Sequence, residues 1–178
     1  MKRVMVEPHL SVTGAMSAEW VPIKAKTDAA FLFAVIHRII KERDWAEVCD
    51  VRFLKEDTTS PYLVGPNGYY MREPSTEKPL IWDLADGQAK PFDANIQDPA
   101  LDGSFKVTGL EIGADDEVWR HDGVEVKPAF QVLLDHMEEY TPDWAEAECD
   151  VPAETIRRVG DEFVAHARVG EFIEIEGE

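Results

Sequence analysis

The first third of the chain alternates short apolar runs with one long amphipathic segment. The runs at 3–6 (RVMV) and 19–23 (EWVPI) are apolar and β-branched, which is typical of strands buried on both faces. Residues 27–45 carry apolar side chains at helical spacing and predict a helix, with Thr27 as its N-cap and Asp28 in its first turn. The expected apolar stripe, wide enough to pack against a sheet, contains Phe31, Leu32, Ala34, Val35, Ile36, Ile39 and Ile40.

Residues 57–128 have a different texture, because proline, glycine and aspartate separate short apolar runs. The turn signals between these runs are typical of hairpins and lie at 65–68 (GPNG), 85–87 (ADG) and 121–123 (HDG). The stretch 90–103 shows no periodicity and predicts irregular chain. We therefore expect a β-rich insertion within a single domain that spans residues 1–178.

Helical spacing returns after this insertion. The predicted helices lie at 128–140, 141–148 and 151–167. Thr141 is the expected cap of the second of them, with Pro142 at the first helical position. The tail at 171–178 alternates apolar and acidic residues, which indicates a short edge strand. The order of elements predicts an α/β fold, with a Rossmann-like partial parallel sheet, helices and the hairpin insertion.

Composition adds a strong charge bias. The 178 residues are 44% hydrophobic, enough to build one core, and 36 acidic side chains outnumber 18 basic ones for a net charge of −18. Such a chain lacks the clustered basic residues that nucleic acid binding requires, and we expect a solvated acidic surface. No apolar run approaches the ~18 residues of a membrane span, and the first ten residues do not form a signal peptide. The chain is expected to be soluble.

Motifs for catalysis by this chain alone are missing. The sequence contains no phosphate-binding loop, no glycine-rich dinucleotide fingerprint, no nucleophile elbow and no C-x-x-C pair. Cys49 and Cys149 lie a hundred residues apart and match no metal spacing. The five histidines are scattered, and we expect most of them at the surface.

Two carboxylates stand where the predicted elements change. Glu7 follows the first strand, and ligands of open α/β sheets bind beyond the carboxyl ends of strands, where an acid can accept hydrogen bonds from a ribose. Asp28 begins the long helix, where a carboxylate can pair with the N–H donors of a purine. The plainer interpretations are an ordinary acid at a strand end and a first-turn acid that stabilises its own helix by roughly 0.3–1 kcal/mol. Spacing alone favours these plainer interpretations.

An ordered set of motifs resembles one family. The blocks VEPH, AEWVPI and AKTDAA, followed by an apolar helix, are similar to a segment of the large catalytic subunits of the dimethyl sulfoxide reductase family of molybdopterin oxidoreductases. In that family an acid and proline end a strand, and P-G-T-D-A-A precedes the helix. Later blocks that continue the resemblance are FLKEDTTSPYLV, GYYMRE, PLIWD, PALDGSFKV, PAFQVLLDHMEEYTPDWAE and VPAETIRRVGDEFVAHA.

The resemblance implies a cofactor. Enzymes of the family hold molybdenum or tungsten between pterins that are usually extended to molybdopterin guanine dinucleotide. By matched position, Glu7, Pro8 and His9 would line the loop at the nucleotide's ribose. Lys26, Thr27 and Asp28 would meet the guanine, with Asp28 reading its donors. The sequence departs from the family where Glu7 replaces an aspartate, His9 an arginine and Lys26 the family glycine.

The same resemblance implies that other segments complete the enzyme. The family's iron–sulfur cysteines and metal ligand lie upstream of the matching region, so we expect an internal piece of a larger subunit that is inactive alone. Its implied partners are an iron–sulfur electron-transfer subunit together with the remainder of the catalytic subunit. Substrate and localisation of the parent stay open. The alternative from another class is a non-enzymatic module that binds a protein through its acidic surface.

Overall fold

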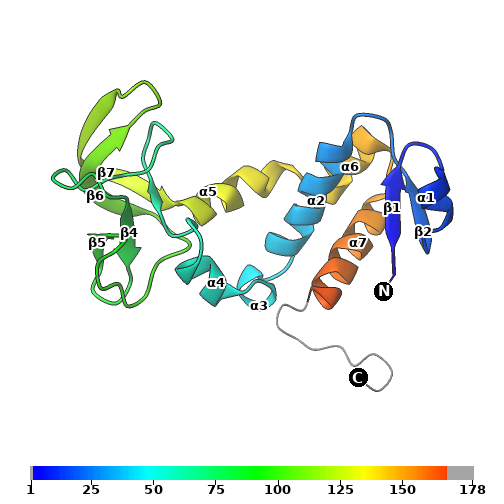
Figure 1. The fold of residues 1–178 in the computed structure, drawn as a ribbon, viewed down its shortest axis with the longest axis horizontal. Coiled ribbons are helices and arrows are strands. Elements are labelled where there is room, and N and C mark those ends of the chain that lie inside the picture. Colours follow the sequence, from blue (N-terminus) through cyan, green and yellow to red (C-terminus); the bar gives the residue numbers. More distant parts are fainter. Residues whose placement is uncertain (1, 168–178) are drawn as a thin grey trace, which may run out of the picture. The chain divides into compact units, whose positions relative to one another are not determined.

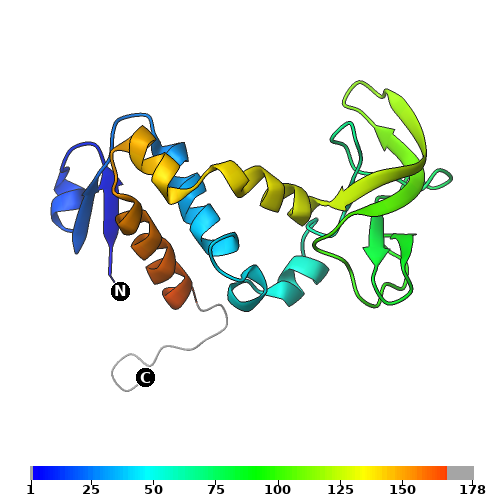
Figure 2. The ribbon, with the colours of Figure 1, turned by 180° about the vertical axis from the view of Figure 1, so that it is seen from behind.

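The computed structural model describes residues 2–167, and the expected edge strand at 171–178 lies outside them (Figures 1 and 2). The chain divides into two compact units. The first comprises Met1–Val48 and Met137–Glu178, and the second comprises Cys49–His136.

The first unit contains a small parallel sheet. Strands β1 (Val4–Glu7) and β2 (Glu19–Pro22) pair in parallel, from Val4 opposite Glu19 to Glu7 opposite Pro22. Their connection contains a short helix, α1 (Val12–Ala15), in a stretch for which the sequence predicted no element. Both predicted strands are confirmed. Because a parallel pair needs a crossover connection of this kind, the α/β class is confirmed as well.

Helices cover one side of this sheet in the first unit. Their bounds are α2 (Asp28–Ile40), α3 (Trp45–Val48), the 3₁₀ turn η1 (Met137–Glu139), α6 (Pro142–Cys149) and α7 (Ala153–His166). Figures 1 and 2 both show α2 beside α6 and α7, against which it packs. The buried core consists of Val21, Ile23, Phe31, Ala34, Ala145, Cys149, Val151 and Ile156.

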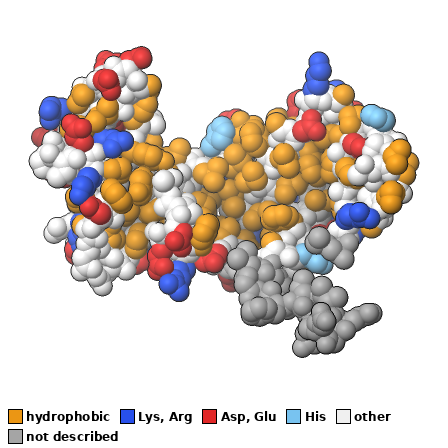
Figure 3. Space-filling view, viewed as in Figure 1, with side chains coloured by type: hydrophobic (Ala, Val, Ile, Leu, Met, Phe, Trp, Pro, Cys, Tyr) orange, Lys and Arg blue, Asp and Glu red, His pale blue; other side chains and the backbone are white. Residues whose placement is uncertain are grey.

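The long helix differs from its prediction in length and in the side chains that it buries. It ends at Ile40 and not near residue 45, and α3 follows as a separate short helix. Leu32, expected in the apolar stripe, is 56% exposed, whereas His37 is only 7% exposed. The space-filling view shows apolar side chains gathered at the surface over α2 (Figure 3). The buried stripe is therefore narrower than the sequence indicated. His37 is buried, but His9, His136 and His166 are exposed, so the expectation that most histidines lie at the surface is confirmed.

The second unit is rich in β-structure. Its elements are α4 (Val51–Glu56), β3 (Leu63–Val64), β4 (Leu80–Asp83), β5 (Gln88–Pro91), β6 (Phe105–Ile112), β7 (Val118–Pro128) and α5 (Ala129–His136). One antiparallel sheet has the order β3-β7-β6, and β4 forms a hairpin with β5. The core of this unit contains Leu63, Met71, Leu80, Val107 and Val126.

Two turn predictions in this unit had different outcomes. The ADG signal lies between β4 and β5, as a hairpin requires. The HDG signal at 121–123 is not a turn, because β7 runs through it and the chain reverses at residues 113–117. The register shifts there, and Gly123 has φ of 61°, so this glycine serves a β-bulge.

No helix in the described part, residues 2–167, is long and apolar enough to cross a membrane.

Candidate functional site

Glu7 is the last residue of β1, and its carboxylate is held by the loop that follows. Oε1 of Glu7 accepts hydrogen bonds from the backbone N–H of Ser11 at 2.8 Å and from its hydroxyl at 2.9 Å. The same hydroxyl accepts from Gly14 N at 3.0 Å and caps α1. The carboxylate is thus fixed over the carboxyl end of the sheet, with Oε2 free of any hydrogen bond to the described residues.

Ser11 and Trp20 fix Glu7, and Gly14 leaves room for it; none of the three was predicted from the sequence. Ser11 and Gly14 belong to S-V-T-G, whose serine is a recognisable N-cap signal. Trp20 on β2 donates its indole N–H to the backbone carbonyl of Glu7 at 3.0 Å. No periodicity reveals this contact, because it depends on the register of two parallel strands.

Pro8 and His9 continue the loop and are both exposed. They lie directly beyond the end of β1, between Glu7 and the cap of α1. Their position leaves them open to a ligand from solvent.

Lys26, Thr27 and Asp28 form the second half of the candidate site, where the chain enters α2. Lys26 is exposed and has φ of 71°, in the left-handed region that favours glycine. This is the position at which the related motif carries its glycine. The backbone therefore keeps the glycine conformation although a lysine occupies it.

Thr27 does not cap α2 with its side chain, which corrects the sequence prediction. It stands at the N-cap position, but its hydroxyl donates to the carbonyl oxygen of Lys24 at 2.6 Å. Asp28 is the first helical residue, and its side chain is exposed. No side chain among residues 2–167 caps the backbone N–H groups of this helix, so an anion or a polar ligand edge can approach them.

The parallel pairing places the carboxyl ends of β1 and β2 at the same end of the sheet, and the two halves of the candidate site follow these ends. Glu7 lies opposite Pro22, the last residue of β2, and five residues connect Pro22 to Asp28. The residues at this end of the sheet provide hydrogen-bond acceptors at Glu7 and Asp28, a cation at Lys26 and uncapped backbone N–H groups at the start of α2. Such a set can hydrogen-bond a sugar diol and the donor edge of a base while it attracts phosphate.

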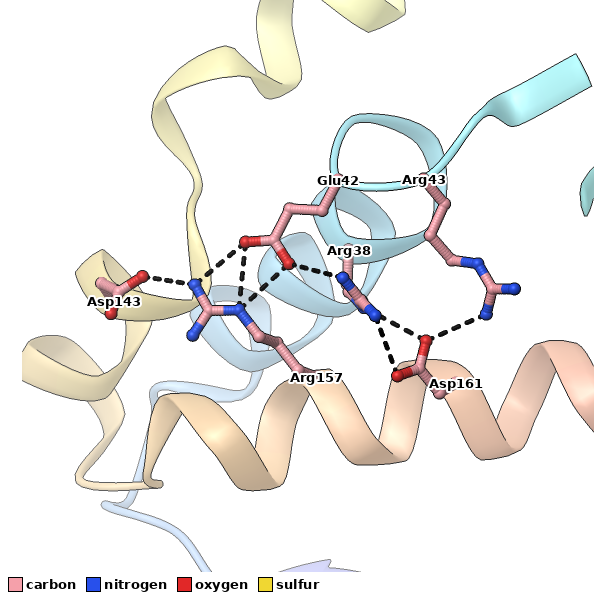
Figure 4. A network of polar contacts seen from close by, with 6 residues as sticks. All are labelled: Arg38, Glu42, Arg43, Asp143, Arg157 and Asp161. Atoms are coloured by element: carbon pink, nitrogen blue, oxygen red, sulfur yellow. Dashed lines mark hydrogen bonds and ion pairs between the residues drawn. The ribbon is translucent and has the colours of Figure 1, made fainter.

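A network of charged side chains holds α2, the helix that follows β2, in place. Its members come from α6, α7 and from α2 with the residues just after it (Figure 4): Arg38, Glu42, Arg43, Asp143, Arg157 and Asp161. Arg157 of α7 donates to Glu42 through Nε at 3.0 Å and Nη2 at 2.9 Å. Arg38 of α2 donates to Asp161 through Nε at 3.1 Å and Nη2 at 3.0 Å. These paired contacts couple α2 to α7 at two points.

The network shifts the pKa values of several of its members. Burial opposes ionisation of Glu42, but hydrogen bonds and charge from Arg157 and Arg38 outweigh it and lower its pKa. The Arg38 hydrogen bonds lower the pKa of Asp161. Glu42 and Asp143 raise the pKa of Arg157 further above its ordinary value. All of these groups are therefore charged at neutral pH, as a positioning network requires.

A second network ties the sheet to α7. Glu19 on β2 accepts from Arg158 and from Lys2, the latter at 2.7 Å, and Glu162 accepts from the same two cations at 2.9 Å. Hydrogen bonds from Lys2 and Arg158 lower the pKa of Glu19. These contacts hold the two-stranded sheet, whose carboxyl end carries the candidate site, against α7.

Two buried carboxylates in the second unit have structural roles. Asp83 is fully buried and accepts from Lys90 Nζ at 2.7 Å and from the backbone N–H groups of Gln97 and Asp98 at 3.0 Å. The Lys90 contact lowers its pKa. Asp83 thereby anchors the irregular stretch after β5. Glu111 accepts from His121 at 2.8 Å and holds the turn at 65–69.

No metal-binding cluster of histidine, cysteine and carboxylate side chains is found among residues 2–167.

Comparison with known proteins identifies relatives along most of the chain. One sulfite dehydrogenase subunit of Allochromatium vinosum is 32% identical over 174 residues, which covers 93% of this chain and 17% of that protein. The alpha subunit of perchlorate reductase of Dechloromonas aromatica is 26% identical over 200 residues, with coverages of 91% and 20%. ArrA of Chrysiogenes arsenatis, the molybdopterin-containing subunit of arsenate respiratory reductase, is 26% identical over 110 residues. No family model matches the chain.

The chain is similar over most of its length to catalytic subunits of the dimethyl sulfoxide reductase family of molybdopterin oxidoreductases. The family resemblance drawn from the sequence is thus confirmed, and the relatives are catalytic subunits of molybdopterin-dependent oxidoreductases. The chain spans a fifth or less of the length of these relatives. It therefore corresponds to a fragment of such a subunit.

Proposed function

We propose that the first unit is part of the molybdopterin-binding scaffold in the catalytic subunit of an oxidoreductase, where it contacts the guanine nucleotide end of the cofactor. The observation that supports this proposal is the common carboxyl end of β1 and β2, where Glu7 and Asp28 follow two neighbouring parallel strands. In open α/β sheets nucleotides bind at this end of the strands. Similarity to the family supplies the cofactor class.

The residues present fit a nucleotide in their chemistry. Glu7 keeps Oε2 available to a ribose hydroxyl, while Ser11 fixes Oε1. Asp28 presents an exposed carboxylate that can accept from the ring N–H and amino group of guanine. Lys26 adds positive charge beside the uncapped helix, which favours the pyrophosphate. Pro8 and His9 belong to the exposed loop that follows Glu7, where they would line the ribose of the nucleotide.

The bound cofactor would supply the redox chemistry through its molybdenum or tungsten ion. This chain's residues would bind and orient only the nucleotide end. The metal ligand and any iron–sulfur cluster, which needs several cysteine thiolates, would come from other parts of the subunit. An electron-transfer subunit is a proposed partner, as is the remainder of the catalytic subunit, and substrate selection belongs to segments around the metal.

Base selectivity tests this proposal. Guanosine diphosphate should bind the chain weakly and more tightly than adenosine diphosphate, because adenine lacks the paired donors that a carboxylate accepts. In Asp28→Asn the preference for guanine should fall about tenfold, the equivalent of one lost charge-assisted contact. Asp44→Asn, an exposed aspartate after α2, is the matched control. Equal affinity for both nucleotides, or an equal effect of the two substitutions, would contradict the assignment.

A further inference from the structure

The turn signal GPNG at 65–68 forms a β-turn within the second unit. Gly68 N donates to the carbonyl oxygen of Gly65 at 3.0 Å, so Pro66 and Asn67 occupy the two middle positions. Asn67 is exposed, and glycine follows it directly. The proposed function does not involve this turn, which lies outside the unit that carries the candidate site.

Glu111 of β6 binds this turn through both oxygens of its carboxylate, which is fully buried. Oε2 accepts from Asn67 Nδ2 at 2.9 Å, and Oε1 accepts from the backbone N–H groups of Asn67 at 3.2 Å and Tyr69 at 3.1 Å. The ring of His121 makes a fourth contact, between Nε2 and Oε2 at 2.8 Å. A Cβ on Gly65 would overlap the carboxylate, so the turn and the acid fit closely. The side-chain amide of Asn67 is thus one of the contacts that close the turn.

An asparagine that precedes glycine is open to spontaneous deamidation, because glycine has no side chain that hinders the reaction. The backbone nitrogen of Gly68 can attack Cγ of Asn67. The new N–Cγ bond closes a succinimide ring, and the Cγ–Nδ2 bond breaks with loss of ammonia, which carries away the amide proton of Gly68. Water then opens the ring. Cleavage of the new N–Cγ bond gives aspartate, and cleavage of the bond between the same nitrogen and the main-chain carbonyl carbon gives isoaspartate.

Both reacting groups are engaged while the turn is closed. Gly68 N, the nucleophile, donates to Gly65, and Nδ2 of Asn67, the leaving group, donates to Glu111. The attack also places negative charge on the amide oxygen of Asn67, which the carboxylate beside this amide disfavours. The reaction therefore requires that the turn first opens, and its rate follows the fraction of chains in which the turn is open.

We propose that Asn67 is a site of deamidation, that Glu111 protects it while the turn is closed, and that the reaction makes an opening of the turn permanent. An aspartate at this position has no N–H group to donate, and its carboxylate would face the buried carboxylate of Glu111. An isoaspartate lengthens the backbone by the Cβ methylene, so the turn no longer matches the spacing of its hydrogen bonds. Either product therefore marks a chain whose turn has opened.

Peptide mass spectrometry of the 178-residue chain tests this inference, which does not rest on the cofactor role. The chain would be incubated at mildly alkaline pH in native buffer and in urea, while the conversion of Asn67 to aspartate and isoaspartate is followed over time. Conversion should be at least about tenfold slower in native buffer, because only the open turn reacts. Asn95, which precedes isoleucine, should react slowly under both conditions and serves as the internal reference.

Substitution of the buried acid should remove the protection. Glu111→Gln should raise the rate of conversion in native buffer about tenfold, because the turn loses charge-assisted hydrogen bonds and opens more often. Glu117→Gln makes the same chemical change at an exposed residue between β6 and β7 and should leave the rate unchanged. Equal native rates in the two variants would overturn the proposal, as would equal rates of Asn67 conversion in native buffer and in urea.

Asn67→Asp introduces the charge of the product directly and gives a second readout that does not require Glu111→Gln to fold. It should lower the equilibrium constant for folding at least about tenfold, as measured by chemical denaturation, because two carboxylates then compete for the same donors. Asn95→Asp makes the same change at the exposed asparagine of this unit and should have little effect. Equal effects of the two substitutions would overturn the proposal, because the modified turn could then close as before.

Discussion

Gly14 leaves the space that the Glu7 carboxylate occupies: a Cβ at this position would contact Oε1 of Glu7 far inside van der Waals distance. No glycine conformation is required here, because Gly14 lies in α1 and its φ is not positive. The close approach alone excludes a side chain. The glycine and the acid therefore depend on each other, although they lie on different elements.

Gly14→Ala should destabilise the chain by about 1–3 kcal/mol, because Glu7 must leave its bonds to Ser11. Chemical denaturation measures the free energy of unfolding. In a Glu7→Ala background the same substitution should cost little, since the clash is gone and alanine favours the helix. Equal costs in both backgrounds would show that the clash is not the cause.

Substitutions at Lys26 test whether the backbone conformation at this position favours glycine. Lys26→Gly should stabilise the chain by up to about 1 kcal/mol, because φ of 71° costs a non-glycine residue more than glycine. Lys26→Val should destabilise it, since a β-branched side chain tolerates this region least. Thermal or denaturant unfolding supplies the comparison. Lys24→Gly, two residues earlier at an ordinary φ, should lower stability slightly.

The ion pair between Glu42 and Arg157 should contribute measurably to stability. Glu42→Gln should lower the free energy of unfolding by about 1–3 kcal/mol, because Arg157 loses its bidentate partner. Glu148→Gln makes the same chemical change at an exposed position on α6 and should be nearly neutral. A similar loss in both variants would mean that the network does not couple the helices.

The depressed pKa of Glu42 also predicts the direction of the acid response. Its folded pKa lies below its unfolded value, so its stabilisation is complete above the unfolded pKa near 4.5 and disappears as pH falls through the folded pKa. Unfolding free energies measured from neutral pH down to about pH 3 should fall less steeply in Glu42→Gln than in the natural sequence. Parallel curves would contradict this.

His37 acts in a higher pH window. Burial lowers its pKa below 6.5, against the opposing charges of Glu42 and Glu138 and together with those of Lys41 and Arg157. The unfolded state therefore takes up a proton first, and stability should fall as pH drops below about 6.5. His37→Leu should remove this decline, as followed by denaturation between about pH 7.5 and 5.5. His9→Asn, at an exposed histidine, should retain it.

The sequence predicted the elements with strong periodicity and the side-chain caps with clear signals. The strands at β1 and β2 and the cap at Thr141, whose hydroxyl accepts from Trp144 N at 3.1 Å, are examples. It failed where tertiary contacts decide, as at Leu32, which stays exposed on α2, and at Gly123, which serves a bulge and not a turn.

For the candidate site, the sequence predicted where both halves lie along the chain, but not the hydrogen bonds that hold them in place. The positions of Glu7 and Asp28 at strand and helix ends follow from local patterns. The bonds from Ser11 and Trp20 depend on a loop conformation and a strand register that no periodicity encodes. The hydroxyl of Thr27 turned away from its expected helix because it donates to the carbonyl of Lys24 in the observed turn.

The central claim is that residues at the carboxyl ends of β1 and β2 contact a guanine nucleotide. Amide chemical shifts test this claim most directly. Guanosine diphosphate would be titrated into the isotopically labelled chain while the signals are followed. Our account predicts shifts at residues 7–9 and 26–28, with smaller changes at Ser11 and Trp20. Shifts confined to residues 49–136, or none at any nucleotide concentration, would contradict it.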